Sequence, residues 1–360
     1  AALEIGPGDE VICPADSFLL TTAFAAANRA TVVFADLDPR SLHLDPEAVE
    51  AAVTPRTRAI VAVDRYGTTG DYHRLRPLAA RHGLALVEDA TASIGAVFDN
   101  TPVGALGTAS FCSLGEAGTS LGVAGLFATD DDGVAAKARR VMLVDDDLDS
   151  PGFDLESGVV GGSYRLAELD ATLASAELAL LGDDAPTRVA NGKHLRRRLD
   201  GLAGIRAPEV VAGATNVYTS FPLVVVPDEL GLDEEASSAL RDTLVDCMTA
   251  EGLRLDRWRA RTLPAGDTRS RRDLYAAAVP PVADPLGETG PGFDLACRRS
   301  SFPVAENAWA GGLVLAGRQA LGPPNSEVEM DAVVDCFVKV LVDNVDRLRQ
   351  LTLERREPLP

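Results

Sequence analysis

Short apolar runs alternate with helical patterns along the first 145 residues, and this alternation limits the folds open to the chain. Six runs have the apolar character of strands buried on both faces: Glu10–Cys13, Thr31–Ala35, Arg58–Val63, Leu84–Glu88, Ala109–Ser113 and Gly125–Thr129. Helical patterns separate them, one beginning at Asp45 and another covering Tyr72–His82. A spacing of about 25 residues from strand to strand predicts right-handed βαβ crossovers. We therefore expect an α/β fold with a mixed, mostly parallel, doubly wound sheet.

The second half of the chain has a different pattern. Apolar residues recur at helical spacing over 166–180, and a second helix is expected over Arg188–Leu202. Beyond residue 205 strands and helices mix, with expected elements at Tyr218–Val226, Glu234–Glu251, Arg254–Trp258 and Ser326 to about Arg349. The last of these begins with the capping box Ser326-x-x-Glu329. We expect two domains, a large one over 1–204 and a smaller α+β domain over 205–360.

Charge and motif content exclude several classes of protein. The chain carries 34 basic and 54 acidic residues, a formal net charge of −20, which opposes binding to nucleic acid or to an anionic membrane surface. It has no apolar run long enough to span a membrane and no charged leader at its start, so we expect a cytoplasmic protein. Five scattered cysteines without a CxxC motif are typical of reduced thiols, and the dispersed histidines lack the spacing of a zinc site.

Asp89 is the best chemical signal in the sequence. It follows the apolar run that ends at Glu88, at the carboxyl end of an expected strand. Ligands of open α/β sheets bind beyond those strand ends. A carboxylate in that place can face a cationic ring nitrogen, although an aspartate that caps the following turn would produce the same pattern.

Several segments around Asp89 occur in the order and spacing of a known family. They are Ile5-Gly6-Pro7-Gly8-Asp9-Glu10, Asp36-Leu37-Asp38, Leu44-Asp45-Pro46, the stretch from Asp89 to Ala96, Val103-Gly104, the Ser/Gly-rich stretch 109–125 and Tyr164-Arg165-Leu166. With these segments the chain resembles the DegT/DnrJ/StrS family of sugar and cyclitol aminotransferases, which use pyridoxal phosphate (PLP) and have the type I aminotransferase fold. The resemblance covers nearly the whole chain and is specific in the first 180 residues.

The resemblance implies roles for individual residues. Asp89 matches the carboxylate that pairs with the pyridinium nitrogen and lets the cofactor act as an electron sink. Phe18 matches the aromatic side chain that stacks on the pyridine ring, and Ser110 or Ser113 lies near the family's phosphate-binding serine. Three further residues match a segment beside the active site and the dimer interface: Tyr164, Arg165 and Glu168.

The chain also departs from the family at positions that carry the chemistry. An ungapped alignment of residues 109–125 puts Glu116 where the family has its Schiff-base lysine. The chain has three lysines, and Lys137, Lys193 and Lys339 all lie in segments expected to be structural or solvated. Other family residues are replaced too: this chain has Ala92 where the family has a glutamine, Asp64 where it has a histidine and Ser163 where it has an asparagine. The family's sequences also begin several dozen residues earlier, with a phosphate-binding Ser-Gly-Thr loop.

These departures lead to three hypotheses. In the first, the chain is a repurposed enzyme that needs no cofactor, in which Glu116, Asp89 and Asp64 form a carboxylate cluster. Neighbouring carboxylates raise one pKa and so supply an acid and a base for dehydration, epimerisation or cyclisation. In the second, the chain is a non-catalytic partner of an active aminotransferase. In the third, it binds PLP or its aminated form (PMP) without a covalent link, as a related dehydratase branch does. Ordinary transamination remains as the fourth reading.

The expected ligand and partners follow from the same resemblance. The substrate is expected to be a small sugar-, cyclitol- or polyketide-like molecule of bacterial secondary metabolism, such as antibiotic biosynthesis. Family members are dimers with their sites at the interface, so we expect a homodimer, or a heterodimer with an active aminotransferase. No metal is expected.

Overall fold

The computed structural model describes residues 1–16, 25, 28–114, 124–142, 164–258, 302–316 and 320–356. A six-stranded sheet forms the first half of the molecule, with strand order β2-β1-β3-β4-β7-β8. Its strands are β1 (Glu10–Pro14), β2 (Thr31–Ala35), β3 (Thr57–Val63), β4 (Ala85–Asp89), β7 (Ala109–Ser113) and β8 (Gly125–Ala128). Only the β7–β8 pair is antiparallel among the described strand pairs of this sheet. The expected mixed, mostly parallel sheet is confirmed.

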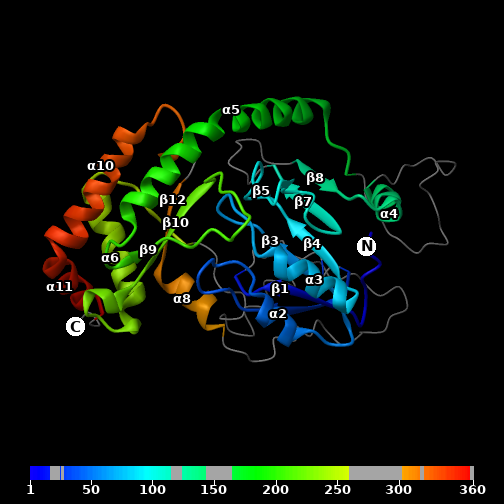
Figure 1. Ribbon diagram of the computed structural model, residues 1–360, viewed down its shortest axis with the longest axis horizontal. Helices are drawn as coiled ribbons and strands as arrows, with labels where there is room; N and C mark the ends of the chain where they lie inside the picture. Colours follow the sequence, from blue (N-terminus) through cyan, green and yellow to red (C-terminus); the bar gives the residue numbers. More distant parts are fainter. Residues whose placement is uncertain are drawn as a thin grey trace.

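Two helices cover one face of this sheet (Figure 1). They are α2 (Pro46–Ala52) and α3 (Tyr72–His82), and each begins at an aspartate whose side chain accepts a backbone N–H of the first turn, Asp45 and Asp71. Every second strand residue, such as Ile12, Ile60 and Leu86, points toward these helices and forms one core with them. The residues between them face the other side of the sheet, because successive side chains of a strand alternate. There α8 (Pro303–Gly311) covers the β1–β3 end through Ala305.

A second, antiparallel sheet organises the other half. Its strand order is β11-β12-β10-β9, from β11 (Asp256–Arg257), β12 (Gly312–Ala316), β10 (Ser220–Val225) and β9 (Ile205–Arg206). The helices packed around it are α6 (Ser237–Ala250), α10 (Glu327–Val338) and α11 (Val345–Arg356). Two short 3-10 turns, η2 (Pro227–Leu230) and η3 (Glu234–Ala236), precede α6, and β5 (Val97–Phe98) pairs with β6 (Thr101–Pro102) in a hairpin. The expected strand at Arg254–Trp258 is therefore only two residues long.

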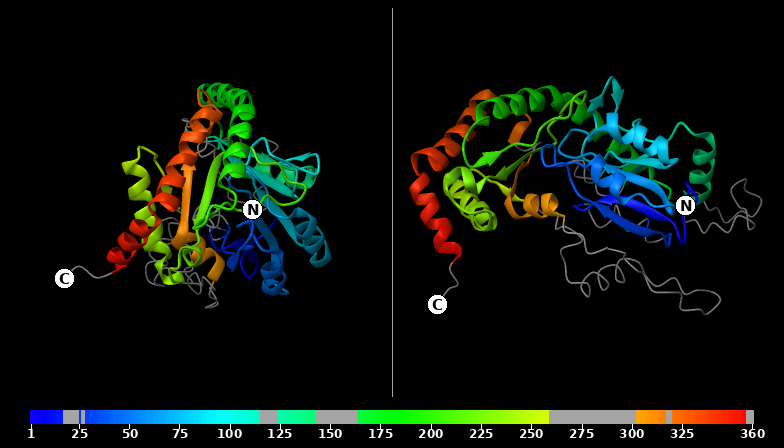
Figure 2. Two further views of the ribbon diagram at one scale, coloured as in Figure 1. Left: turned by 60° about the vertical axis from the view of Figure 1, so that its left-hand side comes forward. Right: turned by 60° about the horizontal axis from the view of Figure 1, so that its bottom comes forward.

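A 32-residue helix, α5 (Glu168–Leu199), runs along both halves (Figures 1 and 2). The sequence predicted two helices here, one over 166–180 and one over Arg188–Leu202, and that prediction is wrong. Arg188 lies two residues after Pro186 and is buried, and its Nε donates at 3.3 Å to the carbonyl of Val217, in the segment just before β10. Leu195 and Leu199 extend the helix into the core of the second half.

The sequence predicted one C-terminal helix from Ser326 to about Arg349, but the structure has the three segments α10, η5 and α11 there. The Ser326 capping box is present as expected, with Ser326 and Glu329 each bonding the other's backbone or side chain. After α10 the chain forms a π-helical turn, η5 (Lys339–Asp343), and Asn344 leaves the helical conformation before α11 begins. The break redirects α11 against α6, so that Leu348 reaches the core. No helix in the part of the chain that the structure describes is long and apolar enough to cross a membrane.

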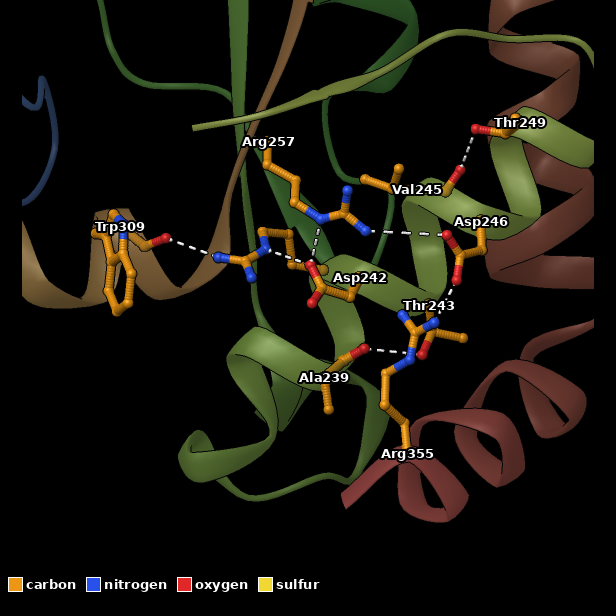
Figure 3. A network of polar contacts seen from close by, with 10 residues as sticks. Ala239, Asp242, Thr243, Val245, Asp246, Thr249, Arg257, Trp309 and Arg355 are labelled. Atoms are coloured by element: carbon orange, nitrogen blue, oxygen red, sulfur yellow. Dashed lines mark hydrogen bonds and ion pairs between the residues drawn. The ribbon is translucent and has the colours of Figure 1, made fainter. Parts of the chain in front are cut away.

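Ion pairs fasten the outer elements of the second half to α6. Figure 3 shows Asp242 of α6 facing Arg257 of β11, whose Nε donates to Asp242 Oδ1 at 2.7 Å. One turn further along α6, Asp246 lies 3.9 Å from Arg257 Nη2 and also pairs with Arg355 of α11. Arg241 completes the set by donating to the carbonyl of Trp309 in α8 at 3.0 Å.

Candidate active site

Asp89 is the last residue of β4, in the middle of the parallel sheet. Its side chain is buried, with 6% of the residue exposed, and Oδ1 accepts the backbone N–H of Thr91 at 3.2 Å. The strand register pairs Asp89 with Val63 of β3 and Phe111 of β7, so the carboxylate lies at the carboxyl edge shared by three strands. The sequence therefore predicted correctly that Asp89 ends a strand at the edge where ligands of open α/β sheets bind.

A pocket of about 720 Å³ extends from Asp89 over the sheet face opposite α2 and α3. Its floor consists of every second residue of four neighbouring strands: Val11, Ala59, Val61, Val87, Asp89, Phe111 and Ser113. Thr91 and Ser113 add hydroxyl groups beside the carboxylate, and Tyr164 lines the rim. An apolar pocket of this size with a few convergent polar groups is typical of a site for a small ligand or cofactor.

Asp64 lies on the other face of the sheet and does not line this pocket. Its carboxyl accepts the N–H of Gly70 at 3.0 Å and the hydroxyl of Tyr72 at 3.1 Å. The link to Asp89 is through the backbone, because the Asp64 N–H donates to the Asp89 carbonyl at 3.0 Å. Asp64 thus orders the loop after β3 and is not positioned to exchange a proton with a ligand in the pocket.

Glu88 is the carboxylate that faces Asp64, and this role was not predicted from the sequence. It is fully buried and accepts two backbone N–H groups, from Gly104 at 2.6 Å and Leu106 at 2.8 Å. Burial and then the charge of Glu88 raise the pKa of the Asp64 carboxyl well above its usual value. Burial also raises the pKa of the Glu88 carboxyl, but the N–H groups of Gly104 and Leu106 oppose that shift, so the larger rise falls on Asp64.

The remaining predicted residues are spread over several environments. Ser110 is buried on the face away from the pocket, where its hydroxyl donates to the carbonyl of Gly104 at 2.6 Å, whereas Ser113 lines the pocket. Tyr164 is 66% exposed at the pocket rim, and Arg165 and Glu168 are exposed at the start of α5. Phe18 and Glu116 lie outside the described residues.

A buried ion pair beside the site was also not predicted from the sequence. Arg65 lies at the end of β3 with its Nη1 3.2 Å from Asp16 Oδ2, and its Nη2 donates to the Asp16 carbonyl at 2.8 Å. Burial raises the pKa of the Asp16 carboxyl, and the Arg65 charge opposes that shift. The pair joins the carboxyl ends of β1 and β3. Only their proximity in space could reveal it, since the two residues are far apart in the sequence.

All three lysines of the chain lie away from the pocket. Lys137 on α4 (Asp132–Met142) pairs with Glu4 at 2.8 Å, and Lys339 pairs with Glu251 at 2.5 Å. Lys193 is exposed on α5 and lines a different groove. The expectation that they are structural or solvated therefore agrees with their positions. None is within the lining of the Asp89 pocket.

The parallel sheet, the second α+β half and the carboxylate at the central strand end define a protein of the type I aminotransferase fold. The sequence pattern of the DegT/DnrJ/EryC1/StrS aminotransferase family matches residues 1–256, and the chain belongs to that family. It is 35% identical over 238 residues to L-glutamine:scyllo-inosose aminotransferase of Streptomyces griseus, which covers 64% of this chain and 56% of the relative. It is 31% identical over 254 residues to GDP-perosamine synthase of Caulobacter vibrioides, covering 70% and 66%. The chain thus spans less than two thirds of these relatives' length.

Solved structures of other proteins share this fold. The chain superimposes on 3-amino-5-hydroxybenzoic acid synthase with a TM-score of 0.73 and 26% identity, covering 96% of this chain and 82% of the other. It superimposes on DesV of S. venezuelae with a TM-score of 0.72 and 28% identity, covering 95% and 80%. These matches confirm the predicted fold class.

The first hypothesis of the sequence analysis, an enzyme without a cofactor, is contradicted by these findings. The family and its solved relatives are PLP-dependent aminotransferases, so the expectation that no cofactor binds was wrong. The carboxylate cluster on which it depended is also not assembled, since Asp64 lies on the opposite face of the sheet from the pocket. The Asp89 pocket fits a pyridine ring, because a buried carboxylate faces a largely apolar cavity with an aromatic side chain, Phe111, in its floor.

Proposed function

We propose that this chain binds PLP or PMP in the Asp89 pocket and acts on a small sugar or cyclitol, without a covalent link between the cofactor and one of its own lysines. The observation that carries the proposal is the contrast between Asp89, buried at the pocket, and the three lysines, which lie elsewhere. When bound, the cofactor supplies an electron sink for charge that develops on the substrate carbon.

The chain's own residues have distinct tasks in this proposal. Asp89 would hold the ring nitrogen in its protonated, cationic form, since an opposite charge at short distance favours the charged state. The Thr91 N–H fixes the orientation of the Asp89 carboxylate through the contact at 3.2 Å. Thr91 and Ser113 offer hydroxyl groups in the pocket, and the apolar floor excludes water from the ring. Glu116, which aligns with the family's Schiff-base lysine, would act as the base in that position.

Ordinary transamination of a sugar or cyclitol is the second candidate, and the names of the curated relatives favour it. It requires a lysine that can reach the cofactor.

We also propose that the chain divides into domains 1–204 and 205–360, and that it assembles as a homodimer or as a heterodimer with an active aminotransferase.

Absorbance spectra with PLP and with PMP, followed by borohydride reduction and peptide mass spectrometry, test the proposal. We expect saturable, reversible binding and no reduced adduct. A reduced adduct on one lysine that disappears in Asp89→Asn would support ordinary transamination instead. An adduct that persists in Asp89→Asn would come from a surface amine outside the pocket. Absence of binding to both cofactor forms would overturn both candidates.

A further inference from the structure

A groove lies at the carboxyl end of α5, the end that Figure 1 shows beside α10. It has a volume of about 510 Å³ and runs between the last two turns of α5 and the strand β9. Leu199, Ile205 and Ala207 form its apolar part, and the turn at Gly201 closes one end with a φ of 76°. The volume is in the range of pockets that hold small molecules.

The groove is basic in a chain that is strongly acidic. Lys193, Arg196 and Arg197 occupy positions i, i+3 and i+4 of α5 and therefore share one face of the helix. Arg206 of β9 adds a fourth cation from the other wall, and Asp200 is the one carboxylate among the lining residues. The formal charge of the lining is thus +3, whereas the whole chain carries −20.

Two of these cations, Lys193 and Arg196, make no hydrogen bond or ion pair in the described part of the chain. The charge of Arg196 acts at longer range on Tyr218 and on Glu209, which Arg40 already binds. Arg197 Nη2 lies 3.1 Å from His194 Nδ1, and the charge of Arg197 also acts on Asp331. Arg206 is 3.6 Å from Glu229, a loose contact. By contrast, Arg198 on the neighbouring face of α5 is paired with Asp331 at 2.6 Å.

The dipole of α5 does not account for this charge. The carboxyl end of a helix is equivalent to about half of a negative elementary charge. That is a small fraction of the +3 carried by the lining. Three like charges on one helix face repel each other, and an anion in the groove would remove that repulsion.

We propose that this groove binds a small molecule that carries phosphate groups. Arginine forks match phosphate oxygens with two parallel hydrogen bonds, and a lysine adds a point charge. Lys193, Arg196 and Arg197 present donors from one wall and Arg206 from the other, so a phosphate between them contacts both. The site is independent of the Asp89 pocket and of the function proposed for it.

Calorimetric titration with inorganic pyrophosphate at constant ionic strength tests the proposal. We expect one saturable site in the whole chain. In Arg196→Gln/Arg197→Gln the affinity should fall at least about tenfold, because each arginine contributes charge-assisted hydrogen bonds. Arg139→Gln/Arg140→Gln is the matched control, since it removes two charges from the last turn of α4. It should bind pyrophosphate like the unaltered chain. No saturable binding, or equal weakening in the control, would overturn the proposal.

A second measurement does not depend on how the variants fold. Acetylation of the native chain can be followed lysine by lysine, because the chain has only three. Pyrophosphate should slow the reaction of Lys193 and leave that of Lys137 unchanged, whereas equal rates at Lys193 with and without pyrophosphate would contradict the proposal. Asp89→Asn should bind pyrophosphate normally, so failure of the cofactor proposal and failure of this one are distinguishable.

Discussion

Asp64 donates its backbone N–H to the carbonyl of Asp89, while its side chain turns to the opposite face of the sheet and meets Glu88. Asp64 therefore bonds the backbone of the residue that carries the candidate cofactor carboxylate, while its own side chain stays outside the pocket. The arrangement follows from the pairing of Val63 with Asp89, which brings the end of β4 beside the first residue after β3.

Replacement of Asp89 should weaken cofactor binding. Asp89→Asn keeps the shape of the side chain but removes the negative charge that would face the ring nitrogen. We expect the dissociation constant of PLP or PMP to rise about tenfold to a hundredfold, the worth of one hydrogen bond to a charged group. Spectroscopic titration measures it, with the exposed Asp170→Asn on α5 as control. Equal affinity of Asp89→Asn and the unaltered chain would exclude Asp89 from the site.

Asp64 should make stability depend on pH. Because its folded-state pKa is raised, the protonated carboxyl favours folding at a pH below about 3.9, the ordinary value for Asp. That contribution is lost as the pH rises through the raised folded-state value. Asp64→Asn cannot ionise, so its free energy of unfolding should fall less steeply between pH 4 and pH 8, by up to about 1.4 kcal/mol per pH unit.

Urea unfolding at several pH values gives this slope. Asp170→Asn removes an exposed carboxylate and should have the slope of the unaltered chain. If Asp64→Asn also has that slope, then the pKa of Asp64 is not raised in the folded protein.

Gly67 should tolerate no side chain. Its φ is 86°, and a Cβ atom there would lie 2.5 Å from the backbone nitrogen of Tyr218 and 2.8 Å from that of Thr219. Gly67→Ala should lower the free energy of unfolding by about 2–4 kcal/mol, because backbone strain and a clash with a second segment add. Gly83 is the matched control, with a φ of 64° and open space around it, so Gly83→Ala should cost only about 1–2 kcal/mol of strain. Chemical denaturation of both variants compares them, and equal losses would contradict the predicted clash.

The buried thiols should be unreactive in the native protein. Burial raises the pKa of Cys13 to about 12, and burial followed by the charge of Asp89 does the same for Cys112. Cys247 and Cys336 are less buried. Among the four cysteines that the structure describes, alkylation by iodoacetamide at pH 8 should therefore label Cys247 and Cys336 first, as peptide mass spectrometry can show, since the thiolate is the nucleophile. Rapid native labelling of Cys112 would show that the thiol is not held in its protonated form.

Local pattern was sufficient for most of the elements. Leu84–Glu88 is displaced by one residue from the observed β4, and the capping box at Ser326 marks the true start of α10. The errors occurred where contacts between distant segments outweigh local preference. α5 continues past Pro186, and Arg188 beyond it is buried with a hydrogen bond to the carbonyl of Val217, a contact that no periodicity within the helix could have predicted.

The sequence by itself determined the parallel sheet, the family and the place of Asp89 at a strand end, because these depend on apolar periodicity and on motifs of neighbouring residues. Only the tertiary structure decided which carboxylates meet. Asp64 and Asp89 were expected to act together, but side chains alternate across a strand, so Glu88 rather than Asp89 shares the face of Asp64. Likewise, the basic groove of α5 and β9 exists only because folding brings Arg206 opposite a helix face whose own residues are close in sequence.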